Sequence, residues 1–343
     1  MSEFINRPLS RRGFLGGATV AAGLGLTACG GQQQQKTEAP SGKEGGGTIT
    51  AGTAYSTQNY DPSTTSSALA LGVNWQVVEG LYGLNFHDYS TFNELATADP
   101  KKVDDYTFEI TLRDGAKFSD GNEVKADDVV ESFNRSAAKG SVYVPMLSPI
   151  ASVEKKDDKT VTVKTTIANF SLLKERLSIV RVVPASSSQD EMKKQPVGSG
   201  PWMYESISDN TLDLVPNKNY NGATPAKDDK LHYDVLKDPT ARLTAQQDGT
   251  TLAMEMVPAD AVDQLKGAGC TVDAVQGFGV RFAMFNLGKA PWDNVKVRQA
   301  CLYALDTDKM LANAFSGQAE VATSYLPSSF ANYHKASTVY AHD

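Results

Sequence analysis

The second half of the chain, beyond Asp238, alternates between helical and extended patterns. Residues 242–248 and 258–266 are predicted to be helical, whereas residues 251–257 and 271–275 are predicted to be extended. Helices and strands that alternate along a chain build parallel βα units, in which helices cover the faces of a sheet. This part of the sequence therefore predicts an α/β fold.

The first half adds strands that are joined by tight turns. Residues 48–53 predict a first strand, and residues 106–113 alternate between apolar and polar side chains. Turn-forming residues at 157–159 and at 208–210 predict two hairpins. The predicted body is therefore α/β with mixed sheets and a β-rich insertion in its first half.

Two helices are predicted among these strands. Leu69, Val73 and Val77 lie four residues apart and form one apolar stripe of the first. The second begins near Ala126, where the acidic residues of 127–128 complement the helix dipole.

Composition excludes several classes of protein. The 343 residues are 41% hydrophobic and 21% charged, which is too apolar for a disordered chain. With 33 basic and 40 acidic residues, the net charge of −7 offers no basic field for nucleic acid. Three scattered cysteines cannot form a disulfide scaffold, and no apolar run reaches the roughly 18 residues of a membrane-spanning helix.

The N-terminus has the features of an export signal. Arg11 and Arg12 lie before an apolar run that is rich in glycine and alanine, and this pattern resembles a twin-arginine signal. Residues 26–29, Leu-Thr-Ala-Cys, resemble a bacterial lipobox, in which Cys29 receives a diacylglycerol. We therefore predict that residues 1–28 are a signal peptide and that residues 29–47 are a flexible tether to the membrane.

The motifs of the body resemble a known family. Residues 112–121, LRDGAKFSDG, followed by the Asp-Asp-Val of 127–129 and Ser-Phe of 132–133, resemble the signature of family 5 extracellular solute-binding proteins. These are the oligopeptide-, dipeptide- and nickel-type binding components of ABC importers. Further segments agree in order, at residues 78–82, 196–202, 217–220, 285–286 and 297–306.

The resemblance implies a two-lobed, three-domain fold like that of the periplasmic binding proteins. Domain I is expected at residues 48–85 and 197–278, with domain II, the β-rich insertion, at 86–196 between them. Residues 279–343 are expected to begin domain III. Since family members are considerably longer, the chain is expected to be C-terminally incomplete.

Some of these motifs also have a local physical account. Gly198 and Gly200 are interpreted as a crossover between domains, where a Cβ atom would clash. Arg298, at a helix start, is interpreted as a structural ion-pair or backbone anchor rather than a ligand group.

The resemblance also implies where a solute would bind. Candidate contacts come from the loop after the first strand, from the crossover near residue 202 and from the entry to domain III. The alternatives are a surface loop for the first group, hinge packing for the tryptophan, and a core or solvated strand position for the last group. The candidate ligand-binding residues are Tyr55, Ser56, Gln58, Asn59, Trp202, Phe278, Gly279 and Arg281.

Catalytic and metal motifs are not recognised in the sequence. The glycines of 267–269 lack the third glycine of a dinucleotide site, and those of 198–200 lack the spacing of a nucleophile elbow. The four histidines show no paired spacing, so neither a cofactor nor a metal is expected. Cys270 and Cys301 can pair outside the cytoplasm, although a packed thiol at Cys301 is the alternative.

Together with the export signal, the resemblance implies a monomeric, lipid-anchored, extracytoplasmic protein that captures peptides and delivers them to ABC permease subunits. The same fold binding a nickel chelate or a sugar is the nearest alternative. A sensory or chaperone-like lipoprotein is a second alternative, and an extracytoplasmic hydrolase is a third.

Overall fold

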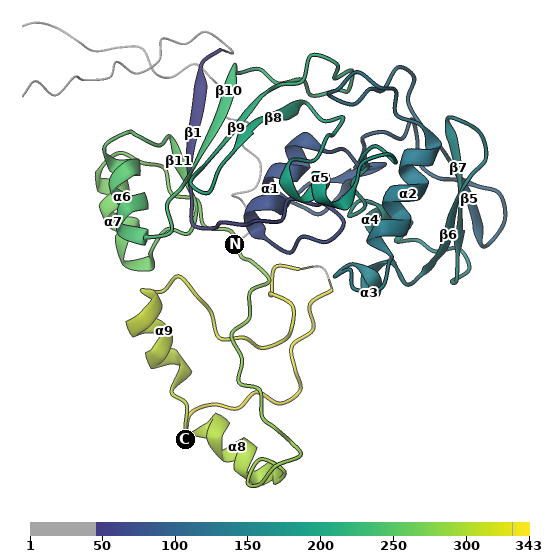
Figure 1. The fold of residues 1–343 in the computed structure, drawn as a ribbon. Coiled ribbons are helices and arrows are strands. Elements are labelled where there is room, and N and C mark those ends of the chain that lie inside the picture. Colours follow the sequence, from purple (N-terminus) through teal and green to yellow (C-terminus); the bar gives the residue numbers. More distant parts are fainter. Residues whose placement is uncertain (1–45, 331) are drawn as a thin grey trace, which may run out of the picture. The chain divides into compact units, whose positions relative to one another are not determined.

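The computed structural model describes residues 46–330 and 332–343, which are drawn in colour in Figure 1. The predicted signal peptide, residues 1–28, lies outside the described residues. The predicted lipidation site Cys29 and residues 30–45 of the predicted tether also lie outside them.

The last two residues of the predicted tether contact the folded body. The backbone N–H of Gly46 donates to the Lys227 carbonyl at 3.0 Å, and the N–H of Gly47 donates to Asp229 Oδ2 at 2.9 Å. Gly46 and Gly47 are therefore already bonded to the body ahead of the first strand.

The largest sheet has five strands, in the order β11 (Ala253–Met254), β1 (Thr48–Thr53), β10 (Lys230–Val235), β9 (Thr211–Pro216) and β8 (Trp202–Ile207) (Figure 1). Strand β1 runs parallel to β10 and to β11, whereas β10, β9 and β8 are antiparallel neighbours. The sheet is mixed, as predicted. Its parallel pairing places the carboxyl ends of β1, β10 and β11 at one edge.

One face of this sheet packs against helix α1 (Ala68–Val77). The predicted apolar stripe of this helix, Leu69, Val73 and Val77, is buried. Because side chains alternate along a strand, every second residue of β8, β9 and β10 meets that stripe. The buried strand residues of this core are Trp202, Tyr204, Leu212, Leu214 and Leu231.

A second, antiparallel sheet has the order β4 (Lys101–Lys102), β5 (Thr107–Thr111), β7 (Thr160–Thr165) and β6 (Ile150–Lys155). The predicted alternation is confirmed, since Phe108, Ile110 and Leu112 are all buried. Helix α2 (Ala126–Ser136) packs on β6 and β7. It begins where predicted, with the Asp128 carboxylate accepting the Lys125 N–H at 2.8 Å.

The remaining elements are shorter. Strands β2 (Tyr82–Leu84) and β3 (Thr91–Asn93) form a hairpin. The other helices are α3 (Val144–Leu147), α4 (Leu173–Leu177), α5 (Gln189–Lys194), α6 (Pro239–Gln247), the 3-10 turn η1 (Ala259–Ala261), α7 (Val262–Gly267), α8 (Val295–Tyr303) and α9 (Thr307–Phe315).

Beyond Asp238 the predicted helices are confirmed, but the predicted strands are only partly so. Of residues 251–257 only the two residues of β11 are in a strand, and residues 271–275 form none. A strand needs a neighbour for its backbone hydrogen bonds, and apolar content alone does not supply one. Val275, for instance, is 79% exposed.

The structure also shows whether Cys270 and Cys301 pair and what Arg298 contacts. Cys270 and Cys301 are both free thiols and half-buried, so the possible disulfide is absent. The Arg298 guanidinium donates to the Trp292 carbonyl oxygen at 2.5 Å, which confirms its role as a backbone anchor.

The predicted lack of space for a Cβ atom at Gly198 and Gly200 is confirmed. A Cβ atom on Gly198 would lie 2.1 Å from the carbonyl oxygen of Val77, and one on Gly200 would lie 2.5 Å from that of Gln76. The Gly200 N–H also donates to the Val77 carbonyl at 2.8 Å. The chain can therefore pass against the end of α1 only without side chains at these positions.

Two largely buried ion pairs lie beside this crossover, and no local sequence pattern indicates either of them. Arg113 binds the Glu79 carboxylate with two hydrogen bonds of 2.8 Å each. Arg181 binds Glu94 Oε2 at 2.8 Å and lies over the Trp75 ring, 3.2 Å from its centroid. Burial raises the pKa of Glu79 against the opposing effect of Arg113, and burial lowers the pKa of Arg181 against the effect of Glu94.

The face of the five-stranded sheet opposite α1 has a titratable cluster. His232 on β10 contacts Asp213 Oδ1 through Nδ1 at 2.6 Å and Asp234 Oδ1 through Nε2 at 3.3 Å. Lys230 pairs with Asp213 at 3.1 Å and with Glu205 at 3.0 Å. The hydrogen bond to Asp213 raises the pKa of His232, which partial desolvation opposes and Asp234 supports.

This cluster predicts a pH dependence of stability. Because the folded pKa of His232 lies above its unfolded value of about 6.5, protonation stabilises the fold below that value. This contribution is lost as the pH rises through the folded pKa. The free energy of unfolding of the wild-type protein should therefore fall as the pH rises from about 5 to about 8, by the contribution of His232. In His232→Gln this part of the fall should be absent when both proteins are measured by urea titration. Parallel pH profiles for the variant and the wild-type protein would contradict the prediction.

Candidate ligand-binding pocket

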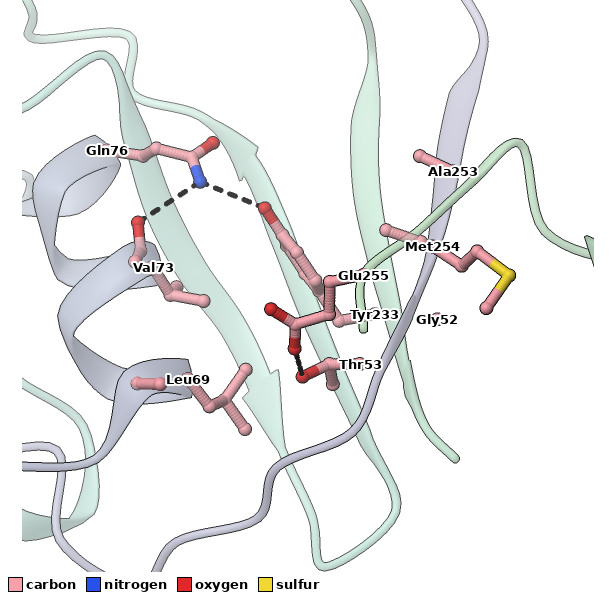
Figure 2. A pocket seen from close by; sticks show the side chains of 12 residues that line it. Gly52, Thr53, Leu69, Val73, Gln76, Tyr233, Ala253, Met254 and Glu255 are labelled. Carbon is pink, nitrogen blue, oxygen red and sulfur yellow. Dashed lines mark hydrogen bonds between the residues drawn. The ribbon is translucent and has the colours of Figure 1, made fainter. Parts of the chain in front are cut away.

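A cavity of about 290 Å³ lies at the carboxyl ends of the parallel strands, beside α1 (Figure 2). In open α/β sheets this edge is the usual place for ligands, because loops diverge there and leave a crevice. Its walls are lined by Ala51, Gly52, Thr53, Ala68, Leu69, Gly72, Val73, Gln76, Tyr233, Ala253, Met254 and Glu255.

Helix α1 forms one wall of the pocket. Ala68, Gly72 and Gln76 lie four residues apart and therefore share one face of the helix. Ala68 and Gly72 are exposed, and a Cβ atom on Gly72 would meet nothing within 4 Å. The space in the pocket thus results from small side chains on an otherwise ordinary helix.

The wall of the pocket opposite α1 carries the carboxylate of Glu255. Glu255 Oε1 accepts hydrogen bonds from the Thr53 hydroxyl at 2.5 Å and from the Ala54 N–H at 3.2 Å (Figure 2). Among the described residues that line the pocket, Glu255 is the only one with a formal charge. The pocket is therefore a mostly apolar space with one fixed negative group.

Two neutral polar groups complete the lining. The Gln76 amide donates to the Tyr233 hydroxyl at 2.9 Å and to the Gly72 carbonyl at 3.4 Å. Burial raises the pKa of Tyr233, and the nearby Glu255 adds to this, although the hydrogen bond from Gln76 opposes it. Tyr233 therefore stays protonated, and since its oxygen accepts from Gln76, its own proton can be donated to a ligand.

None of the eight residues predicted from the sequence lines this pocket. Of the loop after β1, Tyr55 packs against the core below α1, Ser56 is exposed, and Asn59 N–H donates to the Thr57 hydroxyl within the loop. Gln58 instead binds Asp209 Oδ1 at 2.7 Å.

A second cavity, of about 340 Å³, includes Gln58 in its lining. This cavity is open and polar, and it is bordered by two lysines of α5 and by the turn between β8 and β9. Its lining residues are Thr57, Gln58, Tyr60, Lys193, Lys194, Gln195, Ile207, Ser208 and Asp209.

The other predicted residues also lie away from the pocket. Trp202 is buried, with 8% of its surface exposed, and belongs to the core, so the structure places it as a packing residue. Phe278 makes edge contacts with Tyr89 and Phe330, with ring centroids 5.3 and 5.1 Å apart. Gly279 and Arg281 are exposed.

The pocket residues were missed because they come from segments far apart in the sequence. Thr53, Tyr233 and Glu255 meet only because β1 pairs in parallel with both β10 and β11. The available signal was the row of small residues on the exposed side of α1, at positions 68 and 72. Across residues 46–330 and 332–343, no group of three or more potential metal ligands is placed to hold a metal ion, and no helix is long and apolar enough to cross a membrane.

Solved structures with the same fold are solute-binding proteins. The chain superimposes on the periplasmic binding protein DppA from Helicobacter pylori, in complex with the peptide STSA, with a TM-score of 0.75 and 19% identity over 88% of this chain and 64% of that one. For AppA from Bacillus subtilis, in complex with a nonapeptide, the TM-score is 0.74 and the identity 21%, and the match covers 88% of this chain and 62% of AppA. For NikZ from Campylobacter jejuni, in complex with Ni(L-His), the TM-score is 0.73 and the identity 21%, and the match covers 86% of this chain and 60% of NikZ. The predicted α/β fold like that of the periplasmic binding proteins is thereby confirmed.

Sequence comparison gives the family. Residues 92–343 match the family described as bacterial extracellular solute-binding proteins, family 5 Middle, and this chain belongs to that family.

Curated relatives show the same relationship. Heme-binding protein A of Haemophilus influenzae is 32% identical over 76% of this chain and 53% of its own length. The glutathione-binding protein GsiB of Pectobacterium atrosepticum is 28% identical over 79% of this chain and 54% of its own length. A putative ABC transporter peptide-binding protein of Brucella ovis is 29% identical over 63% of this chain and 43% of its own length. The chain spans about half the length of these relatives.

Proposed function

We propose that this protein is a monomeric, lipid-anchored, extracytoplasmic binding protein that captures peptides for uptake by an ABC transporter. Membership of the family of extracellular solute-binding proteins supports this proposal. The observation that carries it is the pocket at the carboxyl ends of β1, β10 and β11, which is open, mostly apolar and equipped with a few fixed polar groups.

The polar groups of the pocket suit a peptide. The Tyr233 hydroxyl can donate to a main-chain carbonyl, and the Gln76 amide oxygen can accept from a main-chain N–H. Contacts that form only in a closed, ligand-bound state shift the population toward that state, which the permease subunits would then recognise.

Native mass spectrometry of the full-length protein, purified from its host, tests the proposed ligand class. We expect an added mass that fragments as a peptide. A co-purified nickel chelate, sugar or heme would replace peptide as the ligand and keep the transport role.

Filling the pocket tests its part in binding. In Gly72→Leu the new side chain would enter the cavity from α1, where its Cβ atom meets nothing, so the fold should be kept. We expect at least a roughly tenfold loss of peptide affinity by calorimetry, because the ligand and the leucine compete for the same space. The matched control Gly72→Ala should keep most of the affinity and raise the free energy of unfolding by about 0.5–1 kcal/mol, because alanine favours the helix. Wild-type affinity in Gly72→Leu would exclude this pocket as the site.

The proposed anchor is tested at Cys29. A diacylglycerol supplies two acyl chains, which is enough for stable membrane attachment. We expect wild-type protein in the membrane fraction of host cells and Cys29→Ser in the soluble fraction. The control Cys270→Ser replaces a free thiol and should remain in the membrane fraction. Membrane attachment that survives Cys29→Ser would contradict the anchor.

A further inference from the structure

We propose that the cavity between α5 and the β8–β9 turn is a second binding site, which takes a small zwitterion of the amino-acid class, with one carboxylate and one ammonium group. The cavity has a volume of about 340 Å³, which suits a small ligand. It shares no lining residue with the pocket beside α1. The inference is therefore independent of the proposed peptide site.

Tyr60 forms a fixed wall of this cavity. The residue is only 3% exposed, and its ring meets the Tyr204 ring edge to face, with centroids 5.8 Å apart. The Tyr60 N–H donates to the Lys193 carbonyl at 2.9 Å, and the Tyr60 carbonyl accepts from the Asn74 amide at 2.8 Å. The phenol is thus held before a ligand arrives, and little entropy is lost on binding.

The hydroxyl of Tyr60 lacks a partner of its own. Within residues 46–330 and 332–343, the hydrogen bonds of Tyr60 are those of its backbone. Burial, together with the nearby Asp209 charge, raises the pKa of Tyr60 to about 12, so the hydroxyl stays protonated. A buried hydroxyl without an acceptor costs free energy, and a ligand carboxylate is a strong acceptor for it.

The charged groups of the lining have both signs. Asp209 Oδ1 accepts from the Gln58 amide at 2.7 Å, which leaves Oδ2 without a donor among the described residues. Lys194 forms no ion pair within that part of the chain, and Lys193 has only Asp190, at 4.0 Å. The cavity thus offers a carboxylate oxygen for an ammonium group and two ammonium groups for a carboxylate.

A ligand with a single charge would match only part of this lining. An anion would face Asp209, and a cation would face the two lysines, without a group of its own to offset the repulsion. An apolar ligand gains little, because Ile207 is the only fully apolar residue that the structure places in the lining. An amino acid carries both charges on one carbon, which suits Tyr60 and Asp209 because they lie close enough for the charge of one to act on the other.

Three matched ligands test the charge pattern: alanine carries both charges, N-acetylalanine only the carboxylate, and alaninamide only the ammonium group. Affinities are measured by ligand-observed NMR on the full-length protein, with Gly72→Leu in every sample so that the pocket beside α1 is filled. Tyr60→Phe removes the hydroxyl and keeps the ring, and Asp209→Asn removes the charge and keeps an oxygen for Gln58. The control Tyr106→Phe removes a hydroxyl from a residue that is 50% exposed and lies outside the cavity.

We expect alanine to bind roughly tenfold more tightly than either analogue. Tyr60→Phe should weaken the binding of alanine roughly tenfold, whereas Tyr106→Phe should leave it unchanged. In Asp209→Asn the advantage of alanine over N-acetylalanine should vanish, because the ammonium group has lost its partner. Equal affinity for the three ligands, unchanged affinity in Tyr60→Phe, or no binding of alanine would overturn this second site, and none of these results would bear on the peptide pocket.

Discussion

Gly198→Ala should lower the free energy of unfolding by about 3 kcal/mol, because the added methyl group has no space. Its carbon would lie 2.1 Å from the Val77 carbonyl oxygen, 2.7 Å from the Val77 carbonyl carbon and 2.8 Å from Val78 Cα. All three neighbours are backbone atoms at the end of α1, so relief requires moving the helix end or the crossover itself. Urea titration of the two proteins measures the loss.

Gly267→Ala is the matched control for this substitution. It adds the same methyl group at the end of α7, where nothing lies within 4 Å. Its free energy of unfolding should stay within about 1 kcal/mol of the wild-type value. Equal effects of the two substitutions would mean that the crossover is not as tight as its contacts indicate.

Arg181→Met should cost about 3–5 kcal/mol, because it leaves a buried carboxylate without its cation. Arg181 is 5% exposed and pairs with Glu94 at 2.8 Å. The methionine fills much of the volume over Trp75 but loses the hydrogen bonds to the carbonyl oxygens of Val78, at 3.2 Å, and Ser178, at 3.0 Å. Chemical denaturation measures the cost.

An exposed ion pair provides the comparison. Lys164 pairs with Glu154 at 3.1 Å on the surface of β7 and β6, so Lys164→Met should change the free energy of unfolding by less than about 1 kcal/mol. The double variant Arg181→Met, Glu94→Gln should recover part of the loss, because the unpaired charge is gone. Equal costs for the buried and exposed substitutions would show that Arg181 is not an essential partner of Glu94.

Local patterns predicted local structure well. The alternation of Phe108, Ile110 and Leu112 predicted β5, and the stripe of Leu69, Val73 and Val77 predicted α1. In both, the period of the apolar side chains reports directly on the face that is buried. The glycine crossover was also predictable, since glycine marks places where backbones approach closely.

Features that depend on distant segments were not predicted. Glu94 and Arg181 are 87 positions apart, and no local pattern links them. Residues 271–275 have the composition of a strand, but strand formation depends on a neighbour that composition does not reveal. The pocket was missed for the same reason, since Thr53 and Glu255 meet only through the pairing of β1 with β11.

The most direct test of the account is an equilibrium titration of the full-length protein with the solute that co-purifies with it. We predict saturable binding of one solute per protein, weakened in Gly72→Leu, with the solute recovered chemically unchanged. Absence of binding, or recovery of the solute as cleaved products, would contradict the assignment of this chain as a solute-binding protein with its pocket beside α1.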